Sequence, residues 1–340
     1  MPRSYVNTPV RVKWNLNDEQ AGKEYPQLIH VYDKVRIAKL YKSKIPYGDI
    51  NTIPKKFPVI LKPRYGCEDE VGRGSKGITI VKSLEQFKEL VNSIRNDKRK
   101  YYWQKYMKPV YETSIDNLIE NGKIIWTFKV KLIMNKDGDL DYMETEPGYV
   151  LPTVYKRWIK KSVPKTYSGP FNIQELNGFM LENHLRCDGV NIYSLNNPLL
   201  KQYVLDLREG KKVKMPTVKI QKYYVIAVYV PYLENSNYSF IANSSGHVEN
   251  GQITFENTRS KLSSNLSPFM IRSILAKNNI VNLWYKHNSF RRSLHSKTHR
   301  FLLFKTYNYQ NGLAARKDIL QAVNHNNTLN VSNCVQAYNL

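Results

Sequence analysis

The sequence predicts an α+β fold with antiparallel sheets, because strand-like and helix-like patterns alternate along its 340 residues. Residues 57–62 and 77–82 are short apolar runs on either side of a glycine-rich polar loop, a pattern typical of a β-hairpin. Residues 123–134 alternate partly in polarity and predict a long strand. A turn at Asn135–Gly138 leads from it into a further strand, which indicates a second antiparallel hairpin.

Helices are predicted where apolar residues recur at helical spacing or where a cap is present. One is expected where Val35, Ala38 and Leu40 fall near one face. Another follows Ser83, a candidate N-cap whose capping box is completed by Gln86. The remaining expected elements are a strand at 101–107, an amphipathic helix at 172–185, strands at 187–195, 201–207 and 223–233, and helices near 267–278 and 313–323.

The charge of the chain predicts a polyanionic partner, either nucleic acid or an acidic protein surface. There are 52 Lys and Arg against 28 Asp and Glu, a net charge of +24. A genome biased toward Asn and Lys is the alternative explanation for part of this excess. No carboxylate occurs between Glu256 and Asp318, and basic and aromatic residues mix at 286–300, which suits either partner. The candidate polyanion-binding residues are Lys286, Arg291, Arg292, Lys297 and Arg300.

Other features of the composition restrict the class of protein. No stretch approaches the length of a membrane span, and the N-terminus lacks the apolar core of an export signal. Cys67, Cys187 and Cys334 are odd in number and far apart, which indicates free thiols in a reducing compartment rather than a secreted protein. HExxH, CxxC and G-x-S-x-G motifs are absent, and residues 146–152, EPGYVLP, are either a substrate loop or a turn.

The glycine-rich loop after Lys62 is a candidate phosphate site. Backbone N–H groups in such a loop can form an anion-binding nest, and glycine lets the chain approach a phosphate closely. A plain hairpin with a flexible tip is the alternative. The surrounding order of elements favours the phosphate site: Asp33-Lys34 opens a helix upstream, and WQKYM at 103–107 and YETSIDNL at 111–118 follow downstream.

This order resembles the ATP-grasp superfamily, whose members bind ATP between two α+β lobes. The likeness extends from about Val31 to Glu209. The resemblance implies that Lys34 and Lys62 contact the ATP phosphates, and that Asp116 belongs to a downstream strand motif with Glu112. It further implies a phosphate flap of Gly72, Gly74, Ser75 and Gly77 and an adenine pocket of Gln104, Lys105, Tyr106 and Met107.

The sequence departs from the family pattern where magnesium ligands are expected. The family places an Asp on one strand and E-x-N on the next, and the matching positions here are Asn191, Asp206 and Arg208. Asn is a weaker ligand for a hard cation, and an arginine repels one. Magnesium binding at Asn191 and Asp206 is therefore doubtful, although a shift of one turn brings in Asp188 or Glu209. Further departures are Lys105 beside the adenine, Lys129 and Lys131 in place of an arginine, and the short segment before Lys34.

From these features we expect an ATP-grasp-like pseudoenzyme with an ATP site, acting as a scaffold or binding component, such as a virion or minor capsid protein of a large DNA virus. Its expected location is the virion or the host cytoplasm. The alternatives are an active ATP-dependent carboxylate–amine ligase that forms an acyl phosphate, and a basic nucleic-acid-binding protein. The expected regions are an N-terminal arm or remnant at 1–30, an ATP-grasp-like two-lobed core at 31–215, and a basic C-terminal region at 216–340 that packs on the core.

Overall fold

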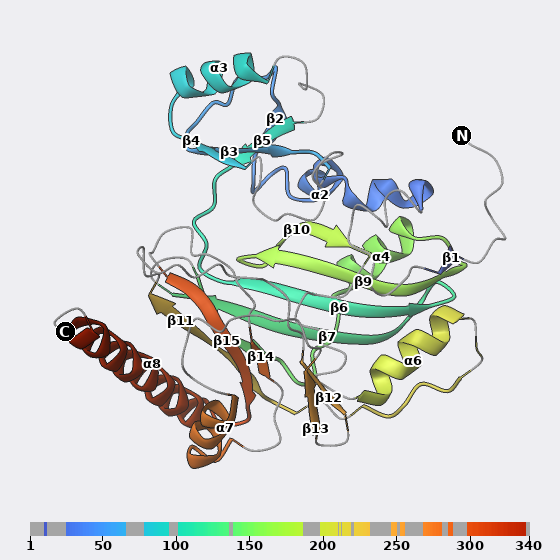
Figure 1. Ribbon diagram of the computed structural model, residues 1–340. Coiled ribbons are helices and arrows are strands. Elements are labelled where there is room, and N and C mark those ends of the chain that lie inside the picture. Colours follow the sequence, from blue (N-terminus) through green and yellow to red (C-terminus); the bar gives the residue numbers. More distant parts are fainter. Residues whose placement is uncertain are drawn as a thin grey trace. The chain divides into compact units, whose positions relative to one another are not determined.

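The computed structural model describes residues 10–11, 25–65, 78–94, 101–135, 139–185, 198–209, 211, 213–218, 221–231, 246–249, 252–255, 268–280, 285–287 and 298–337. The chain divides into two compact units (Figure 1). Unit 1 comprises Met1–Val130 and Glu146–Ile220, and unit 2 comprises Lys131–Thr145 and Gln221–Leu340. None of the helices in the described part of the chain is long and apolar enough to cross a membrane.

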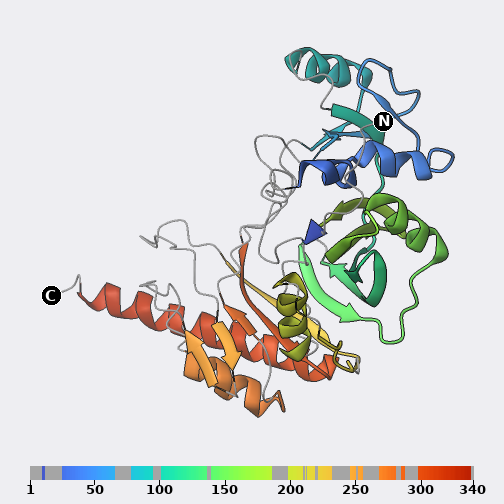
Figure 2. The same cartoon turned by 90° about the vertical axis from the view of Figure 1, so that its right-hand side faces the viewer.

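A small antiparallel sheet in unit 1 carries the predicted glycine hairpin. Its strand order is β2 (Tyr47–Asp49), β5 (Tyr101–Lys105), β3 (Val59–Pro63) and β4 (Thr79–Val81). Helix α3 (Leu84–Ser93) covers one face of this sheet (Figures 1 and 2). Val59, Leu61 and Trp103 point to that face and pack with Phe87 of the helix. Because strand side chains alternate, Lys62 projects from the opposite face.

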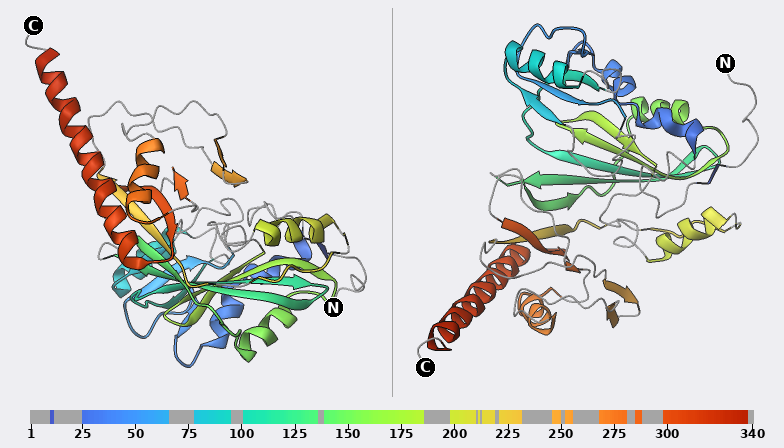
Figure 3. Two further views of the ribbon diagram at one scale, coloured as in Figure 1. Left: turned by 90° about the horizontal axis from the view of Figure 1, so that it is seen from below. Right: turned by 45° about the horizontal axis from the view of Figure 1, so that its top comes forward.

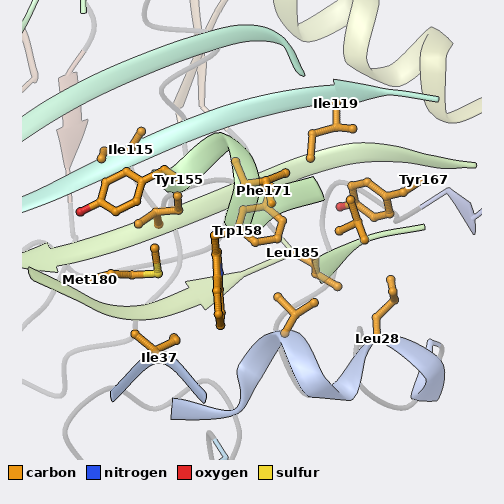
Figure 4. Close-up of a cluster of buried hydrophobic side chains, with 14 of the residues drawn as sticks. Leu28, Ile37, Ile115, Ile119, Tyr155, Trp158, Tyr167, Phe171, Met180 and Leu185 are labelled. Carbon is orange, nitrogen blue, oxygen red and sulfur yellow. The ribbon is translucent and has the colours of Figure 1, made fainter. Parts of the chain in front are cut away.

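A larger antiparallel layer in unit 1 is built on β6 (Glu112–Glu120) and β9 (Tyr167–Leu176). β7 (Lys123–Met134) lies beside β6, and its residues up to Val130 belong to unit 1. β10 (Phe179–His184) and the short β1 (Val10–Arg11) both pair with β9. One face of this layer packs on 3-10 helix η1 (Pro26–Tyr32), α2 (Lys34–Leu40) and α4 (Thr153–Ser162). Figure 4 shows this core, in which Leu28 and Ile37 point toward the strands. Its other labelled members are Ile115, Ile119, Tyr155, Trp158, Tyr167, Phe171, Met180 and Leu185.

Unit 2 has its own sheet and core. Strands β8 (Leu140–Thr145), β11 (Tyr224–Pro231), β15 (Thr298–Thr306) and β14 (Tyr285–His287) lie in this order. Helices α7 (Pro268–Lys277) and α8 (Tyr309–Ala337) lie side by side (Figures 1 and 3). Their buried apolar side chains pack on β11 and β15. A separate hairpin pairs β12 (Gly246–Glu249) with β13 (Gln252–Phe255).

Most expected elements are confirmed. β7 coincides with residues 123–134, and α2, α3, β3, β4, β5, β11, α7 and α8 overlap their predicted ranges. Ser83 caps α3, since its Oγ accepts a hydrogen bond from the Gln86 backbone N–H. The predicted strand at 187–195 lies outside the described residues.

Two predicted elements are wrong. Residues 172–185 form no helix but the end of β9, a turn and β10. Asn177 and Gly178, with φ of 52° and 80°, make the tight turn that a two-residue hairpin requires. Residues 201–207 form no strand but part of helix α6 (Pro198–Glu209), because Leu200, Tyr203 and Leu207 recur at helical spacing and are buried.

Candidate phosphate-binding site

Lys34 and Lys62, which come from different elements, lie beside the carboxylate of Glu182 on β10. Lys34 Nζ is 2.7 Å from Glu182 Oε2, and His184 Nε2 is 3.5 Å from Glu182 Oε1. Lys62 lies close enough to both Lys34 and Glu182 that their charges alter its pKa. Lys34 and Glu182 thus both act on Lys62, and Glu182 is a carboxylate that the sequence did not single out. Contact of the two lysines with phosphate stays a prediction.

An ion pair between the buried Asp33 and the partly exposed Arg64 links the two lysine-bearing elements. Asp33 caps helix α2, accepting a hydrogen bond from the Val35 backbone N–H at 3.0 Å. Its two carboxylate oxygens also accept hydrogen bonds from Arg64, from Nε at 2.9 Å and from Nη2 at 2.7 Å. The Lys34 backbone N–H donates to the Arg64 carbonyl oxygen at 3.0 Å. The N-terminus of α2 is therefore fixed to the end of β3, two residues beyond Lys62.

Burial and neighbouring charges shift the pKa values at this site in a consistent way. Burial first, and then the neighbouring Lys34 ammonium, lower the pKa of Lys62 to about 7, while Glu182 acts in the opposite direction. Burial opposes ionisation of Glu182, but Lys34 and His184 outweigh it and hold the pKa of Glu182 well below its usual range. The site therefore contains an ionised carboxylate and a lysine that is protonated only in part at neutral pH.

One face of the β6–β9–β10 layer is polar next to this site. Glu182 pairs with Gln174 across β10 and β9, and His184 pairs with Asn172. Directly opposite residues of an antiparallel pair point to the same face, as do residues two apart. β6 adds Ser114 opposite Gln174 and Asp116 opposite Asn172. The six side chains of Ser114, Asp116, Asn172, Gln174, Glu182 and His184 therefore share one face.

This polar face is largely buried and is ordered by hydrogen bonds. Asp116 is 0% exposed, and Asn172 is 1% exposed. Asn172 Nδ2 donates to Ser114 Oγ at 2.7 Å and to Asp116 Oδ1 at 3.2 Å. The network is incomplete, because the buried Asn172 Oδ1 accepts no hydrogen bond from any described residue.

Two of the predicted adenine residues, Gln104 and Lys105, lie on β5 of the small sheet, and Tyr106 and Met107 follow its end. Gln104 pairs with Ile60 and Tyr102 pairs with Lys62, so Gln104 and Tyr102 point to the same face as Lys62. The Tyr102 ring lies under the lysine, with Nζ 5.3 Å from its centroid. Gln104 is buried, Lys105 is exposed, and Tyr106 and Met107 are partly buried. Glu112 begins β6 on the face that carries Ser114 and Asp116.

Other candidate residues lie elsewhere or outside the described ranges. Gly72, Gly74, Ser75, Gly77 and Asn191 are outside them, as are Arg291, Arg292 and Lys297. Lys286 and Arg300 lie in β14 and β15, and Arg208 lies in α6. Asp206 is on α6, where its carboxylate accepts hydrogen bonds from Gln202 at 3.0 Å and Lys211 at 3.1 Å. The described residues contain no group of three or more His, Cys, Asp or Glu side chains arranged for a metal ion.

Sequence reasoning missed Glu182, His184 and Arg64. Glu182 was overlooked because residues 172–185 were assigned to a helix, whereas they form the end of β9, a turn and β10. The signal for the correct assignment is the Asn177-Gly178 pair between apolar runs, which indicates a hairpin. Arg64 carries no such local signal, since its partner Asp33 lies 31 residues earlier.

Comparisons with known proteins support the fold. No model of a known protein family matches the sequence, and no curated protein matches it. Among solved structures, the chain is similar to N5-carboxyaminoimidazole ribonucleotide synthetase from Thermus thermophilus, with a TM-score of 0.49, 11% identity and coverage of 89% of this chain and 78% of that one. It is similar to phosphoribosylamine–glycine ligase from Thermotoga maritima, with a TM-score of 0.49, 12% identity and coverage of 87% and 77%.

A third similar structure is Rhizobium etli pyruvate carboxylase, with a TM-score of 0.50 and 11% identity. The likeness covers 89% of this chain but 28% of that much longer one. At this identity the likeness shows the fold alone. The chain has an α+β ATP-grasp-like fold with antiparallel sheets, as its sequence predicted.

Proposed function

We propose that unit 1 binds the triphosphate of ATP at Lys34, Lys62 and Glu182 and acts as an ATP-dependent ligase. The observation that carries this proposal is the environment of Lys62. Its side chain is 6% exposed, and it forms no ion pair with any described residue, since Glu182 pairs with Lys34 instead. A buried cation without a paired anion is costly, and a phosphate oxygen would supply the missing charge.

The side chains around Lys62 could contact both the phosphates and the base of a nucleotide. Lys62 and Gln104 share one face of the small sheet, so a ligand that contacts Lys62 with its phosphates can extend along the strands toward Gln104. The face that carries Glu182 also carries the amide of Gln174 directly opposite, and these are oxygen ligands of the kind that Mg²⁺ prefers. Magnesium would neutralise charge on the phosphates. The protein's own contribution is to hold the phosphate chain between two fixed ammonium groups.

The chemistry proposed for this site is activation of a carboxylate. The γ-phosphoryl group of ATP passes to a carboxylate oxygen, ADP leaves, and an amine then displaces phosphate from the acyl phosphate to form an amide. Little of this chemistry requires a protein nucleophile, so positioning and charge stabilisation are sufficient. That matches a site made of lysines, one ionised carboxylate and neutral polar side chains.

The test is equilibrium binding of a fluorescent ATP analogue to the whole chain, followed by measurement of ADP release. Lys62→Met should weaken ATP binding by about ten- to a hundredfold, the range expected from losing one or two charge-assisted hydrogen bonds. Lys56→Met is the matched control, because Lys56 is exposed and lies on the same lobe. It should change the affinity by less than about twofold.

Glu182→Gln separates binding from turnover. It removes the carboxylate without changing the side-chain size, so ATP should bind in the absence of Mg²⁺ while Mg²⁺-dependent ADP release is lost. An unchanged affinity of Lys62→Met for ATP would overturn the assignment of the site.

A binding protein without turnover is the second candidate, the pseudoenzyme of a virion or other assembly that the sequence predicted. The observation that favours it concerns the described residues of the site: Glu182 is already engaged by Lys34, and neutral Gln174 stands opposite. Two metal ions at a triphosphate are usually held by more acidic side chains. Tight ATP binding by the wild type with no ADP release, across a panel of carboxylates and amines, would select this function.

A further inference from the structure

We infer that a groove between β7 and α4 binds an acidic peptide whose apolar side chains enter the groove. This site lies in unit 1 and shares no residue with the phosphate-binding site. The groove has a volume of about 690 Å³, within the range of ligand sites in proteins. It is lined by residues 122–127 of the β6–β7 turn and β7, by residues 149–151, and by one side of α4.

Charge is the first observation behind this proposal. Lys123, Lys156 and Lys160 line the groove and are exposed, and none of the three forms an ion pair within the part of the chain that the structure describes. No described residue of the lining is acidic, and α4 as a whole contains Lys and Arg but neither Asp nor Glu. Three unneutralised ammonium groups around one groove attract a ligand with several negative charges.

Apolar surface is the second observation. Val150 of the lining is 74% exposed, and Ile124 and Ile125 are partly exposed. A ligand that supplies only charge would leave these apolar side chains in contact with water. A chain that carries both carboxylates and apolar side chains satisfies the lysines and the apolar surface together.

The aromatic rings of the groove favour a peptide over a single-stranded nucleic acid. The Trp126 ring stacks on Phe128, with centroids 5.6 Å apart and planes 8° apart. The Tyr149 ring faces Lys129 Nζ, which is 4.8 Å from its centroid. Base stacking needs open aromatic faces, but Trp126 is buried and Lys129 already occupies one face of the Tyr149 ring.

The experiment measures binding of a fluorescein-labelled six-residue peptide of alternating glutamate and leucine to the whole chain, without nucleotide. The groove variant carries Lys123→Glu, Lys156→Glu and Lys160→Glu. The control variant carries Lys42→Glu, Lys44→Glu and Lys55→Glu, which are exposed lysines of the same unit and give the same net charge. The groove variant should bind at least about tenfold more weakly, and the control should change by less than about twofold.

Two further measurements test the exposed position Val150 and the apolar side chains of the peptide separately. Val150→Glu alone alters an exposed position, so the chain should fold, and the added negative charge should weaken peptide binding about threefold or more. A peptide of alternating glutamate and serine should bind several-fold more weakly than the leucine peptide, because it buries less apolar surface.

Three results would overturn the proposal. The first is no measurable binding of the leucine peptide to the wild type. The second is an equal loss in the groove and control variants, which would show a response to net charge alone. The third is binding of six-residue oligothymidylate as tightly as the peptide and with the same sensitivity to the groove variant, which would assign the groove to nucleic acid.

Discussion

The two faces of the β6–β9–β10 layer differ in composition although the same strands form both, and Thr113, Asn117 and Glu175 are the buried polar exceptions on the mainly apolar face. On one face Ile115, Phe171 and Ile173 are 0% exposed and pack into the apolar core with α4 and η1. On the other face their sequence neighbours Asp116 and Asn172 are equally buried but polar, and Glu182 is an ionised carboxylate. A sheet with one solvent-exposed face can place polar residues on that face at no cost, but burial of this second face makes each polar group depend on a partner.

This difference separates the residues of unit 1 that stabilise the fold from those that contribute to the proposed ligand site. The apolar face contributes burial energy, whereas the polar face contributes fixed charges and hydrogen-bonding groups to the site of Lys34 and Lys62. Changes on the apolar face should therefore act mainly on folding. Changes on or beside the polar face should act on ligand binding and on pH dependence.

The largest effect on stability is expected from Phe171→Ala. The ring is fully buried in the apolar core, so its removal should lower the free energy of unfolding by about 3–5 kcal/mol. Urea unfolding followed by tryptophan fluorescence measures this, because Trp103, Trp126 and Trp158 all belong to unit 1. A loss below about 1 kcal/mol would contradict the view that this face carries the stability.

The Asp33–Arg64 pair should affect both folding and binding. Asp33→Asn keeps the helix cap but removes the charge that Arg64 contacts, so stability should fall by about 1–3 kcal/mol. ATP affinity should fall as well, because Lys34 and Lys62 lose their common anchor. Asp49→Asn is the control, since Asp49 is exposed and bonds only locally to Asn51. An unchanged ATP affinity in Asp33→Asn would show that the pair is merely structural.

Lys62 should make stability depend on pH. Its pKa is about 7 in the folded chain, against about 10.4 when unfolded, so between these values the unfolded chain binds more protons. Stability therefore rises as the pH increases from 7 toward 10, by up to about 1.4 kcal/mol per unit. Denaturant unfolding at pH 7, 8 and 9 should show this slope in the wild type.

The matched variant Lys62→Met should lack that part of the slope, because methionine does not titrate. ATP binding at pH 8 should also take up most of one proton in the wild type, as the phosphates raise the lowered pKa of Lys62. Calorimetry in two buffers of different ionisation enthalpy measures this uptake. Equal proton uptake by the wild type and Lys62→Met would refute the link between this lysine and the phosphates.

The smallest effects concern the turns that set the register of the two faces. Gly178 has φ of 80°, and an added Cβ would meet only the Tyr111 hydroxyl at 3.6 Å, so Gly178→Ala should cost about 1 kcal/mol from backbone strain alone. Gly122, with φ of 70°, is more restricted, because its Cβ would lie 2.8 Å from the Lys165 Cα. Gly122→Ala should therefore destabilise more than Gly178→Ala, and equal unfolding midpoints would contradict this ranking.

The small sheet was predictable because its signals are local. The strand ending at Lys62, the Ser83 cap and the strand at 101–107 each follow from a few neighbouring residues, and the family resemblance then pairs Lys34 with Lys62. The larger layer was predicted less well. Residues 172–185 are buried on both faces, so their apolar and polar residues do not show the simple alternation of a half-exposed strand.

The carboxylate of the site was missed for the same reason. Once 172–185 had been assigned to a helix, the next strands were sought at 187–195 and 201–207, and the doubt about magnesium followed from Asn191 and Arg208. The helical spacing of Leu200, Tyr203 and Leu207 contradicts a strand at 201–207, and the Asn177-Gly178 turn contradicts a helix at 172–185. The contact between Asp33 and Arg64 could not be predicted from neighbouring residues, because the two residues are 31 positions apart.

The contact between Asp33 and Arg64 also has an evolutionary consequence. The two residues meet through two parallel hydrogen bonds, a geometry that lysine cannot reproduce at position 64. Among homologous chains, we therefore expect these two positions to vary together rather than singly. The segment between them contains exposed stretches such as residues 51–53, where insertions should accumulate without moving either lysine.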